Sequence, residues 1–285
     1  MGTGKNTGKK DMENLKAKFQ RFSVVIIYWK RSIKTMEKYF KIQFEFDHQK
    51  LEKIIIDNSL KNKGYCCFVD SNVLVESHMA NNNGILEVLN NSLVNSCDGS
   101  YIAILASLVY KRKFKPYNGP EFFDKFIYFN EKHCIIGNTD VVFEKIKSKV
   151  EGINGFSNLH YISLPFLTVD NFDYEVIAKE INSLKPRYIW VSLGAPKQEF
   201  FMYKLLPHLE SGVMLGVGAA LNYFSGEITD IPKWATKFNL IWLFRILTEP
   251  KKQIKRVLKI LKYYPGIYSS QKRELRLEYQ KSIKL

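Results

Sequence analysis

Cysteine and histidine are few in this sequence, and neither residue type forms a recognisable motif. The four cysteines show no CxxC pair and no regular spacing, and they are Cys66, Cys67, Cys97 and Cys134. We therefore expect reduced thiols, as in a cytosolic protein, rather than a disulfide framework. The five histidines are scattered and contain no HExxH motif, so the sequence predicts no metal site.

A hydrophobic run long enough to cross a bilayer is lacking near the N-terminus. The apolar stretch SVVIIYW (residues 23–29) is followed directly by Lys30 and Arg31, whereas a membrane-spanning helix needs roughly 20 apolar residues. The stretch also lacks a small-residue cleavage site. We interpret residues 1–38 as a basic extension that is poorly ordered or lies on a membrane surface. A start-site artefact, with Met36 as the true first residue, explains them equally well.

Acidic residues are scarce at both ends of the chain. The formal net charge is +15; residues 1–36 carry nine Lys/Arg and two acids, and residues 233–285 carry fourteen and three. The body between them is therefore mildly acidic. This distribution indicates that the ends bind a polyanion or an anionic membrane, and it says little about the body.

From about residue 40 the sequence alternates between short β-rich runs and helical patterns. The run GYCCFVDS (64–71) is typical of a strand, segments 132–150 and 173–209 combine strands, turns and helices, and 212–226 adds one more strand and turn. Repeated units of this kind predict an α/β fold with a Rossmann-like, mostly parallel sheet and helices on both faces. We place this core at residues 39–232.

Ligands of such a sheet bind at the carboxyl ends of its strands, where the strand-to-helix turns converge. Four turns are therefore candidates for a site, at residues 70–72, 97–100, 193–199 and 215–219. In the second of them, Asp98 is interpreted either as a helix N-cap or as a general base toward a hydroxyl group. The two roles would compete for the same carboxylate oxygens.

The motif SLGAPKQE (192–199) predicts a phosphate-binding turn. Gly194 lets the chain leave its strand without a Cβ, and Pro196 suits the first position of a helix. The N–H groups of Lys197, Gln198 and Glu199 would then be free at a helix N-terminus, whose partial positive charge favours phosphate. The Lys197 side chain adds a full charge. An ordinary strand-to-helix turn explains this motif equally well.

The glycine-rich motif GVGAAL (216–221) allows close backbone approach to a ligand at Gly216 and Gly218. It is an incomplete GxGxxG fingerprint, and no acidic ribose contact follows at the usual distance. A dinucleotide is therefore not favoured, whereas a nucleoside diphosphate would fit. We expect no cofactor.

The C-terminal stretch EPKKQIKRVLKILKYY (249–264) predicts a basic amphipathic helix. At about 100° per residue, Ile254, Val257, Leu258 and Leu261 fall on one side of it. Such a helix suits an anionic membrane interface or a partner; alternatively, it docks its apolar face on its own domain. We assign residues 233–285 to a helical appendage that binds the membrane.

Several of these segments together resemble the WecG/TagA/CpsF glycosyltransferases, glycosyltransferase family 26. The most specific are SLGAPKQE (192–199), GVGAALNYFSGEITDIPKW (216–234) and NLIWLFRILTEPKK (239–252), in the family's order and spacing, and CDGSYIAILAS and YNGPEFFDKFI fit the central part. The resemblance runs from about residue 40 to 262. It implies an inverting, metal-independent transfer from a UDP-sugar to a polyprenyl-diphosphate-linked sugar in bacterial cell-surface polysaccharide synthesis. The enzyme would be peripheral on the cytoplasmic face of the membrane.

The resemblance also implies roles for individual residues. Asp98 matches the family's proposed catalytic base, and Arg245, Lys252 and Lys255 match basic positions that close over the site and stabilise the departing UDP. Cationic side chains and helix N-termini can take the place of a metal in this task. The donor sugar does not follow from the resemblance, because members use N-acetylmannosamine, its uronic acid or glucose. The acceptor of the best-known members is undecaprenyl-diphosphate-N-acetylglucosamine.

The sequence departs from the family's pattern at three places. Pro116 stands where an arginine is common, so that a neighbouring lysine would have to supply the charge. Asp70 replaces the threonine of a TxN turn whose Asn72 is retained, and Asn222 replaces an aspartate of the glycine-rich segment. We assign Asn72 and Asn222 to substrate binding, and these departures leave the donor sugar open more than the reaction type.

A basic α/β nucleic-acid-binding protein is the alternative hypothesis, based on the two basic ends. Its affinity would fall steeply with salt, but a nucleic-acid helix has no need of the apolar stripe at residues 254–261. A nucleotide-dependent oxidoreductase or methyltransferase is disfavoured by the incomplete glycine motif. We therefore expect a UDP-sugar, a lipid-linked acceptor and an anionic membrane as partners, and no nucleic acid.

Overall fold

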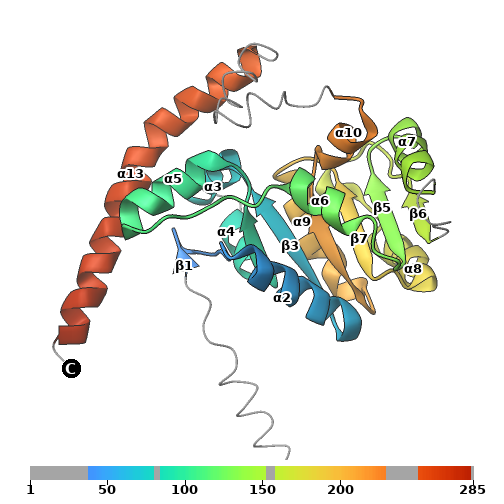
Figure 1. Cartoon of the computed structure of the whole chain (residues 1–285), viewed down its shortest axis with the longest axis horizontal. Helices are drawn as coiled ribbons and strands as arrows, with labels where there is room; N and C mark the ends of the chain where they lie inside the picture. The colour runs from blue at the N-terminus through green and yellow to red at the C-terminus, as the bar shows by residue number, and fades with distance from the viewer. Residues whose placement is uncertain (1–37, 80–83, 152–157, 229–249, 284–285) are drawn as a thin grey trace, which may run out of the picture. The chain divides into compact units, whose positions relative to one another are not determined.

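The computed structural model describes residues 38–79, 84–151, 158–228 and 250–283 (Figure 1). The proposed N-terminal extension, apart from its last residue, lies outside the described residues, and so does the segment 229–249. The domain boundaries at residues 38 and 232 therefore stay predictions.

A six-stranded parallel sheet forms the centre of the protein, in the order β4-β3-β8-β7-β5-β6. Its strands are β3 (Lys63–Val69), β4 (Val94–Cys97), β5 (His133–Gly137), β6 (Leu159–Ile162), β7 (Tyr188–Ser192) and β8 (Gly212–Gly216). A short antiparallel pair precedes it, formed by β1 (Lys38–Tyr39) and β2 (Ile42–Gln43). The predicted α/β, Rossmann-like class is confirmed.

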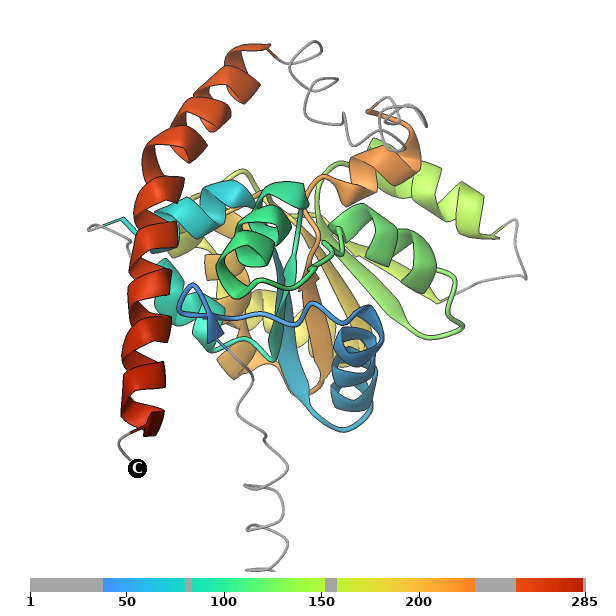
Figure 2. The ribbon, with the colours of Figure 1, turned by 60° about the vertical axis from the view of Figure 1, so that its left-hand side comes forward.

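Helices connect the strands and cover both faces of the sheet (Figures 1 and 2). They are α2 (His48–Lys61), α3 (Ser71–Ser77), α4 (Ile85–Asn90), α5 (Ser100–Tyr110), α6 (Gly119–Phe126), α7 (Asp140–Glu151), α8 (Tyr174–Leu184), α9 (Lys197–Leu205), α10 (Ala220–Ser225) and α13 (Pro250–Ile283), with 3-10 turns η1 (Val169–Asn171) and η2 (Leu206–His208). On one face α2 contacts β3 and β8, and Lys125 of α6 binds Glu52 of α2. On the other face α9 contacts β3, β7 and β8 and packs against α4 and α8.

Aspartate side chains cap the N-termini of three of these helices. Asp47 accepts the N–H of Lys50 at the start of α2, and Asp173 accepts that of Val176 at the start of α8, both at 3.1 Å. Asp70 plays the same part for α3. Caps of this kind satisfy N–H groups that have no partner within the helix, so they fix where each strand-to-helix turn ends.

The strands are apolar because they are covered on both sides. Every residue of β5, β7 and β8 is buried, as in other parallel sheets between two helical layers. The buried Trp190 indole donates to Nδ1 of His133 at 3.0 Å. Burial lowers the pKa of His133 to about 4, so its ring is neutral at neutral pH and serves the core rather than a reaction.

The C-terminal helix α13 docks on α3 and α5 by a face other than the apolar one. Its buried side chains follow one another at intervals of four or seven residues, and they are Gln253, Ile260, Ile267 and Gln271. Ile254, Leu258 and Leu261 are 50%, 60% and 66% exposed. The alternative in which the helix docks its apolar face on its own domain is therefore wrong for these three residues.

Candidate active site

The carboxyl ends of four neighbouring strands, β4, β3, β8 and β7, bring all four predicted turns to one edge of the sheet. Val69 and Cys97 are register partners at the ends of β3 and β4, so Asp70 and Asp98 follow on adjacent strands. The Asp98 N–H donates to the Val69 carbonyl at 2.9 Å and ties the two turns together. Gly216 ends β8, between β3 and β7. Two carboxylates and the glycine-rich turn therefore share this edge.

The Asp70 carboxylate is engaged by both of its oxygens. Oδ1 accepts the N–H groups of Asn72 and Val73 at 2.9 and 3.0 Å, and Oδ2 lies 3.2 Å from Nη2 of Arg256 on α13. The two side chains of this ion pair are only 22% and 18% exposed, for Asp70 and Arg256 respectively. Asp70 therefore serves as the cap of α3 and as an anchor for α13.

Asp98 occupies a different position from the one that a helix cap requires. Gly99 is the N-cap residue of α5, with φ of +106°, a conformation that glycine adopts without strain. The interpretation of Asp98 as the N-cap is therefore wrong. Its half-buried side chain lies at the site edge, and the assignment as general base stays a prediction. Asn72, also half-buried, is the second residue of α3.

The start of α9 differs from the predicted phosphate cradle. Pro196 is the N-cap rather than the first helical residue. The N–H of Gln198 donates to the carbonyl of Gly194 at 2.9 Å. This N–H is therefore not free for a phosphate, which corrects one of the three donors that the sequence predicted.

The Lys197 side chain extends toward the segment that follows β6. Its Nζ lies 5.3 Å from the ring centroid of Phe166 and 5.2 Å from that of Phe172. Phe166 itself is fully exposed. Contacts of a cation with aromatic faces contribute about 0.5–1 kcal/mol at exposed sites, so they hold the ammonium group at this side of α9 only weakly.

Gln198 and Glu199 lie beneath the turn, with 3% and 0% of their surfaces exposed. Nε2 of Gln198 donates to the Gly216 carbonyl at 2.8 Å and to Oε1 of Glu199 at 3.2 Å. Oε1 of Gln198 lies close to Gly218, where an added Cβ would come within 3.3 Å of it. Gln198 and Glu199 therefore pack against the buried side of the glycine-rich turn and stabilise it. Direct binding of substrate by these two side chains stays a prediction.

The Glu199 carboxyl group is mostly protonated at neutral pH. Its pKa is raised to about 8, chiefly by burial and also by the neighbouring Asp70 and Glu76, while its own backbone N–H and the bond from Gln198 oppose the rise. Its Oε2 has no hydrogen-bond partner among the described residues. An uncharged acid leaves the start of α9 without a negative charge, and this is compatible with an anionic ligand at the helix N-terminus.

A polar network joins the glycine-rich turn to β5 and β7. Nδ2 of Asn138 donates to Oδ1 of Asn222 at 2.8 Å and to Oγ of Ser192 at 3.0 Å, and Oγ of Ser192 donates to the Gly218 carbonyl at 2.8 Å. Sequence reasoning found Asn222 and Gly218 but missed Asn138 and Ser192. The signal was present, because both residues directly follow or end a strand at the same edge.

The structure describes the side chain of one of the three predicted basic residues of the appendage. Arg245 lies outside the described residues, and the structure describes the helix at Lys252 but not its side chain. Lys255 is exposed on α13. Arg256 does reach the edge, through Asp70. It was missed, although it is the only arginine between residues 250 and 262.

The position of Pro116, where the family has an arginine, lies beside α2. Nε2 of His48 is 3.1 Å from the Pro116 carbonyl, and Lys113 and Lys115 nearby are exposed. Three residues farther on, α6 begins at Gly119, where an added Cβ would come within 3.2 Å of the Val217 carbonyl. The start of α6 thus contacts the glycine-rich turn.

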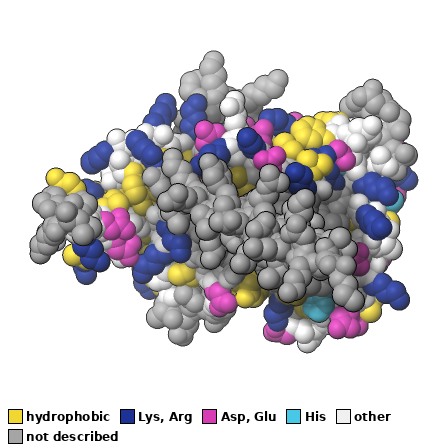
Figure 3. Space-filling model, turned by 90° about the horizontal axis from the view of Figure 1, so that it is seen from below, with side chains coloured by type: hydrophobic (Ala, Val, Ile, Leu, Met, Phe, Trp, Pro, Cys, Tyr) yellow, Lys and Arg dark blue, Asp and Glu magenta, His cyan; other side chains and the backbone are white. Residues whose placement is uncertain are grey.

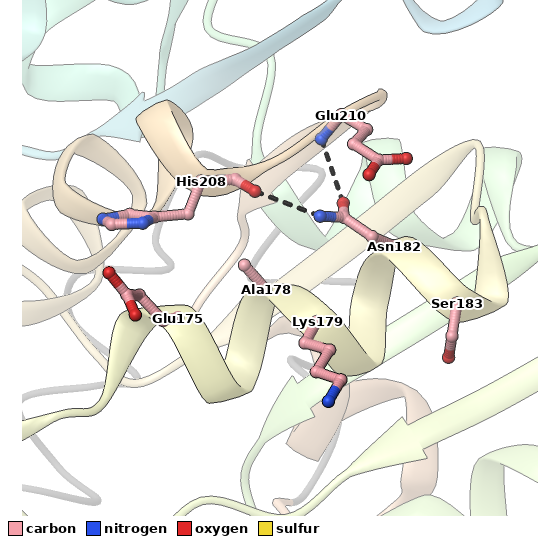
Figure 4. A pocket seen from close by; sticks show the side chains of 7 residues that line it. All are labelled: Glu175, Ala178, Lys179, Asn182, Ser183, His208 and Glu210. Carbon is pink, nitrogen blue, oxygen red and sulfur yellow. Dashed lines mark hydrogen bonds between the residues drawn. The ribbon is translucent and has the colours of Figure 1, made fainter.

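A shallow surface hollow lies between α8 and η2, away from these residues (Figure 4). Its lining is polar, and consists of Glu175, Ala178, Lys179, Asn182, Ser183, His208 and Glu210. Asn182 joins its two sides, because Nδ2 donates to the His208 carbonyl at 3.0 Å and Oδ1 accepts the Glu210 N–H at 2.9 Å. None of the strand-end residues lines it, so we do not assign it to the site. Among the described residues, no group of three or more His, Cys, Asp and Glu side chains could hold a metal ion.

Lys and Arg side chains are visible at several separate places on the described part of the face shown in Figure 3, with acidic and hydrophobic side chains among them. Clustered basic residues are the electrostatic footprint of nucleic-acid binding. The nucleic-acid hypothesis stays a prediction.

Comparison with known proteins places the chain in a family. The model of the glycosyl transferase WecG/TagA/CpsF family matches residues 40–276. Curated relatives named N-acetylglucosaminyldiphosphoundecaprenol N-acetyl-beta-D-mannosaminyltransferase include one from Bacillus spizizenii, 29% identical over 56% of this chain and 57% of the relative, and one from Bacillus subtilis, 30% identical over 52% of each. A third, from Staphylococcus aureus, is 31% identical over 43% of this chain and 47% of the relative. The alignments thus span about half the length of these relatives.

Proposed function

Because the chain belongs to the WecG/TagA/CpsF family of glycosyl transferases, we propose that it transfers a sugar from a UDP-sugar to a sugar linked to a polyprenyl diphosphate. The observation that supports this most directly is the pair of carboxylates at the adjacent ends of β3 and β4. Asp70 is held by two N–H groups and Arg256. We assign the role of base to Asp98, which matches the family's proposed catalytic base.

In the proposed reaction, Asp98 removes the proton from the acceptor hydroxyl group while that oxygen attacks the anomeric carbon of the donor. The bond between this carbon and the diphosphate oxygen breaks, and its electron pair leaves with UDP. Attack on the face opposite the leaving group inverts the configuration. A positioned general base of this kind contributes about 10²–10⁴-fold to the rate.

The departing UDP carries negative charge that the protein has to stabilise. We assign this task to Arg245, Lys252 and Lys255 of the appendage and to the helix N-terminus of α9, because fixed charges and dipoles can stabilise a developing anion without a metal. The sequence contains no DxD motif of the kind that holds a metal in other transferases. The residues at the turns, Gly194 and Gly216 among them, would let the backbone come close to the diphosphate.

The names of the curated relatives favour one donor sugar and one lipid-linked acceptor. They describe transfer of N-acetylmannosamine to N-acetylglucosaminyl-diphosphoundecaprenol. We propose the same acceptor class here, and N-acetylmannosamine, its uronic acid or glucose as the donor sugar. The polar network around Asn222 and Asn138 lies at the edge where this choice would be made.

We further propose that the protein binds the membrane as a peripheral protein, on the cytoplasmic side. In the described part of the chain, no helix has the length and apolar character to cross a bilayer. The exposed Ile254, Leu258 and Leu261 on the basic helix α13 suit insertion at an anionic interface. A lipid-linked acceptor would be reached from that position.

The test is UDP release by purified protein on liposomes that contain polyprenyl-diphosphate-N-acetylglucosamine, with a panel of UDP-sugars. We expect one donor to be active, and Asp98→Asn, which keeps the shape of the side chain, to lower kcat about 10²–10⁴-fold. Glu210→Gln, the same change from carboxylate to amide at an exposed position, is the control. If Asp98→Asn released UDP as fast as the wild type, Asp98 would not be the base.

A further inference from the structure

The helix α5 begins directly after Asp98 and Gly99 and presents two aliphatic side chains to solvent. Ile104 and Leu108 are 55% and 54% exposed, and they lie one turn apart on the same side of the helix. The opposite side of α5 is buried in the core. This side of α5 is therefore apolar. Residues 99–120 contain no acidic residue, so every charged residue near it in the sequence is basic.

The first turn of α5 lies close to α13. Burial raises the pKa of Tyr101, and the guanidinium of Arg256 partly opposes this rise, which places the two side chains next to each other. Leu108 is seven residues after Tyr101 and therefore points the same way from α5. The aliphatic pair thus flanks the seam between α5 and α13, which contact each other and meet in Figure 1.

The same seam is apolar on the side of α13. Tyr268 lies beside the end of α5, since Lys272 and then Lys111 lower its pKa. Leu261 and Ile254 precede Tyr268 by seven and fourteen residues, so they extend in one row along this side of the helix. We call the exposed aliphatic side chains of both helices the α5–α13 face, and they are Ile104, Leu108, Ile254, Leu258 and Leu261.

Basic side chains border this face. Lys111, Lys113 and Lys115 are exposed just after α5, and Lys255 and Lys262 are exposed on α13. Residues 250–273 contain no acidic residue. Apolar side chains with a border of exposed lysines have the chemistry of a surface that enters the headgroup region of an anionic bilayer.

We propose that the α5–α13 face docks on the surface of an anionic lipid bilayer, with α5 contributing as an equal partner of the C-terminal helix. This inference rests on the proposed function in one respect, because it explains how a lipid-linked acceptor would reach the site. Asp98 stands at the beginning of α5. A bilayer in contact with α5 would therefore present the acceptor's diphosphate-linked sugar beside the turn that carries the proposed base.

Binding of the full chain to vesicles tests the contribution of α5 directly. The vesicles contain phosphatidylcholine with about a third phosphatidylglycerol, and bound protein is measured by flotation. We expect the double variant Ile104→Gln/Leu108→Gln to bind about tenfold more weakly than the wild type, because two aliphatic side chains no longer leave water. Binding of the wild type should be lost on pure phosphatidylcholine and should weaken with salt.

A matched control makes the same change on other helices. Val141 and Val176 are 58% and 62% exposed, on α7 and α8, and the variant Val141→Gln/Val176→Gln should bind vesicles like the wild type. Equal binding by the α5 variant and the wild type would overturn the proposal, and so would equal weakening by both variants. Urea midpoints show that each variant is folded.

Two further outcomes separate this inference from others. If the face were covered by a second copy, the wild type would be a dimer in solution, the α5 variant a monomer, and neither would bind vesicles; this would also overturn the proposal.

The rate of UDP release gives a second readout. The α5 variant should release UDP about tenfold more slowly than the wild type with an acceptor in vesicles, and at the same rate with an acceptor that has a short, water-soluble chain. If the wild type releases no UDP with either acceptor, the proposed transfer fails while the vesicle result stands.

Discussion

Glu199 is the residue whose protonation should be visible in the stability of the protein. Its pKa is raised from 4.5 to about 8 by burial, so between these values the folded state holds a proton that the unfolded state has released. The stabilising contribution is complete below about pH 4.5 and is lost as the pH rises through about 8. We expect the free energy of unfolding to fall by at most about 1.4 kcal/mol per pH unit in this window.

The variant Glu199→Gln separates this group from others that titrate in the same range. It keeps an acceptor for Gln198 and carries no titratable proton, so the decrease with pH should become shallower. Urea unfolding at pH 5.5, 7 and 8.5 measures the effect. Glu210→Gln, at an exposed position, is the control and should retain the slope of the wild type. Parallel slopes for the wild type and Glu199→Gln would show that folding does not raise the pKa of the Glu199 carboxyl group.

At the scale of elements, the ion pair between Arg256 and Asp70 fastens α13 to the end of β3. Both side chains are mostly buried, so the pair should contribute more than the 0–1 kcal/mol typical of surface pairs. We expect a double-mutant cycle with Arg256→Gln and Asp70→Asn to give a coupling energy of about 1–2 kcal/mol. Asparagine preserves the cap of α3, so the cycle reports the ion pair. Additive losses in urea unfolding would mean that α13 is held by other contacts.

The nearby pair of Lys259 and Glu76, with 2.9 Å between Nζ and Oε1, offers a comparison for that cycle. Its side chains are 27% and 32% exposed, which is more than those of the Arg256 pair. Lysine also lacks the planar fork of arginine. A smaller coupling energy is therefore expected for Lys259→Gln with Glu76→Gln.

The elements show what a sequence pattern does and does not reveal. The strands β3, β5, β7 and β8 were predicted because buried parallel strands are continuous apolar runs, whereas β6 is a short edge strand whose side chains are mostly half-buried and gives no such run. Periodicity also found the helix at residue 250. It could offer docking of the apolar side on the domain only as an alternative to membrane binding, because a side that stays exposed and a side that is buried share the same period.

The candidate site was predictable to a similar degree. The turns that carry Asp98 and Gly216 were located because parallel strands end at a common edge. The contact between Asp70 and Arg256 joins residues 186 positions apart, and no local pattern encodes it. The burial of Glu199 was also missed, since a glutamate in the first turn of a helix is normally a solvated residue.

For the whole molecule, the rate at which the buried cysteines react with a thiol reagent reports how often the sheet opens. All four are unpaired and buried, on β3, β4 and β5, as the expectation of reduced thiols requires. Burial also raises the pKa of each thiol, so reaction with a thiol reagent requires opening of the sheet. We expect the folded protein to react slowly and all four thiols to react at one common rate, which is set by global unfolding.

Binding of the proposed leaving group should slow this reaction. UDP bound at the carboxyl edge stabilises only the folded protein, and at a free concentration of 100 times its Kd it reduces the open population about 100-fold. The rate of labelling, followed at increasing UDP, therefore gives Kd without any turnover. Cys97 is the informative position, because it precedes Asp98 at the site edge. If Cys97 reacted quickly and UDP slowed it alone, the edge would open locally. If UDP changed no rate, the folded protein would not bind the nucleotide.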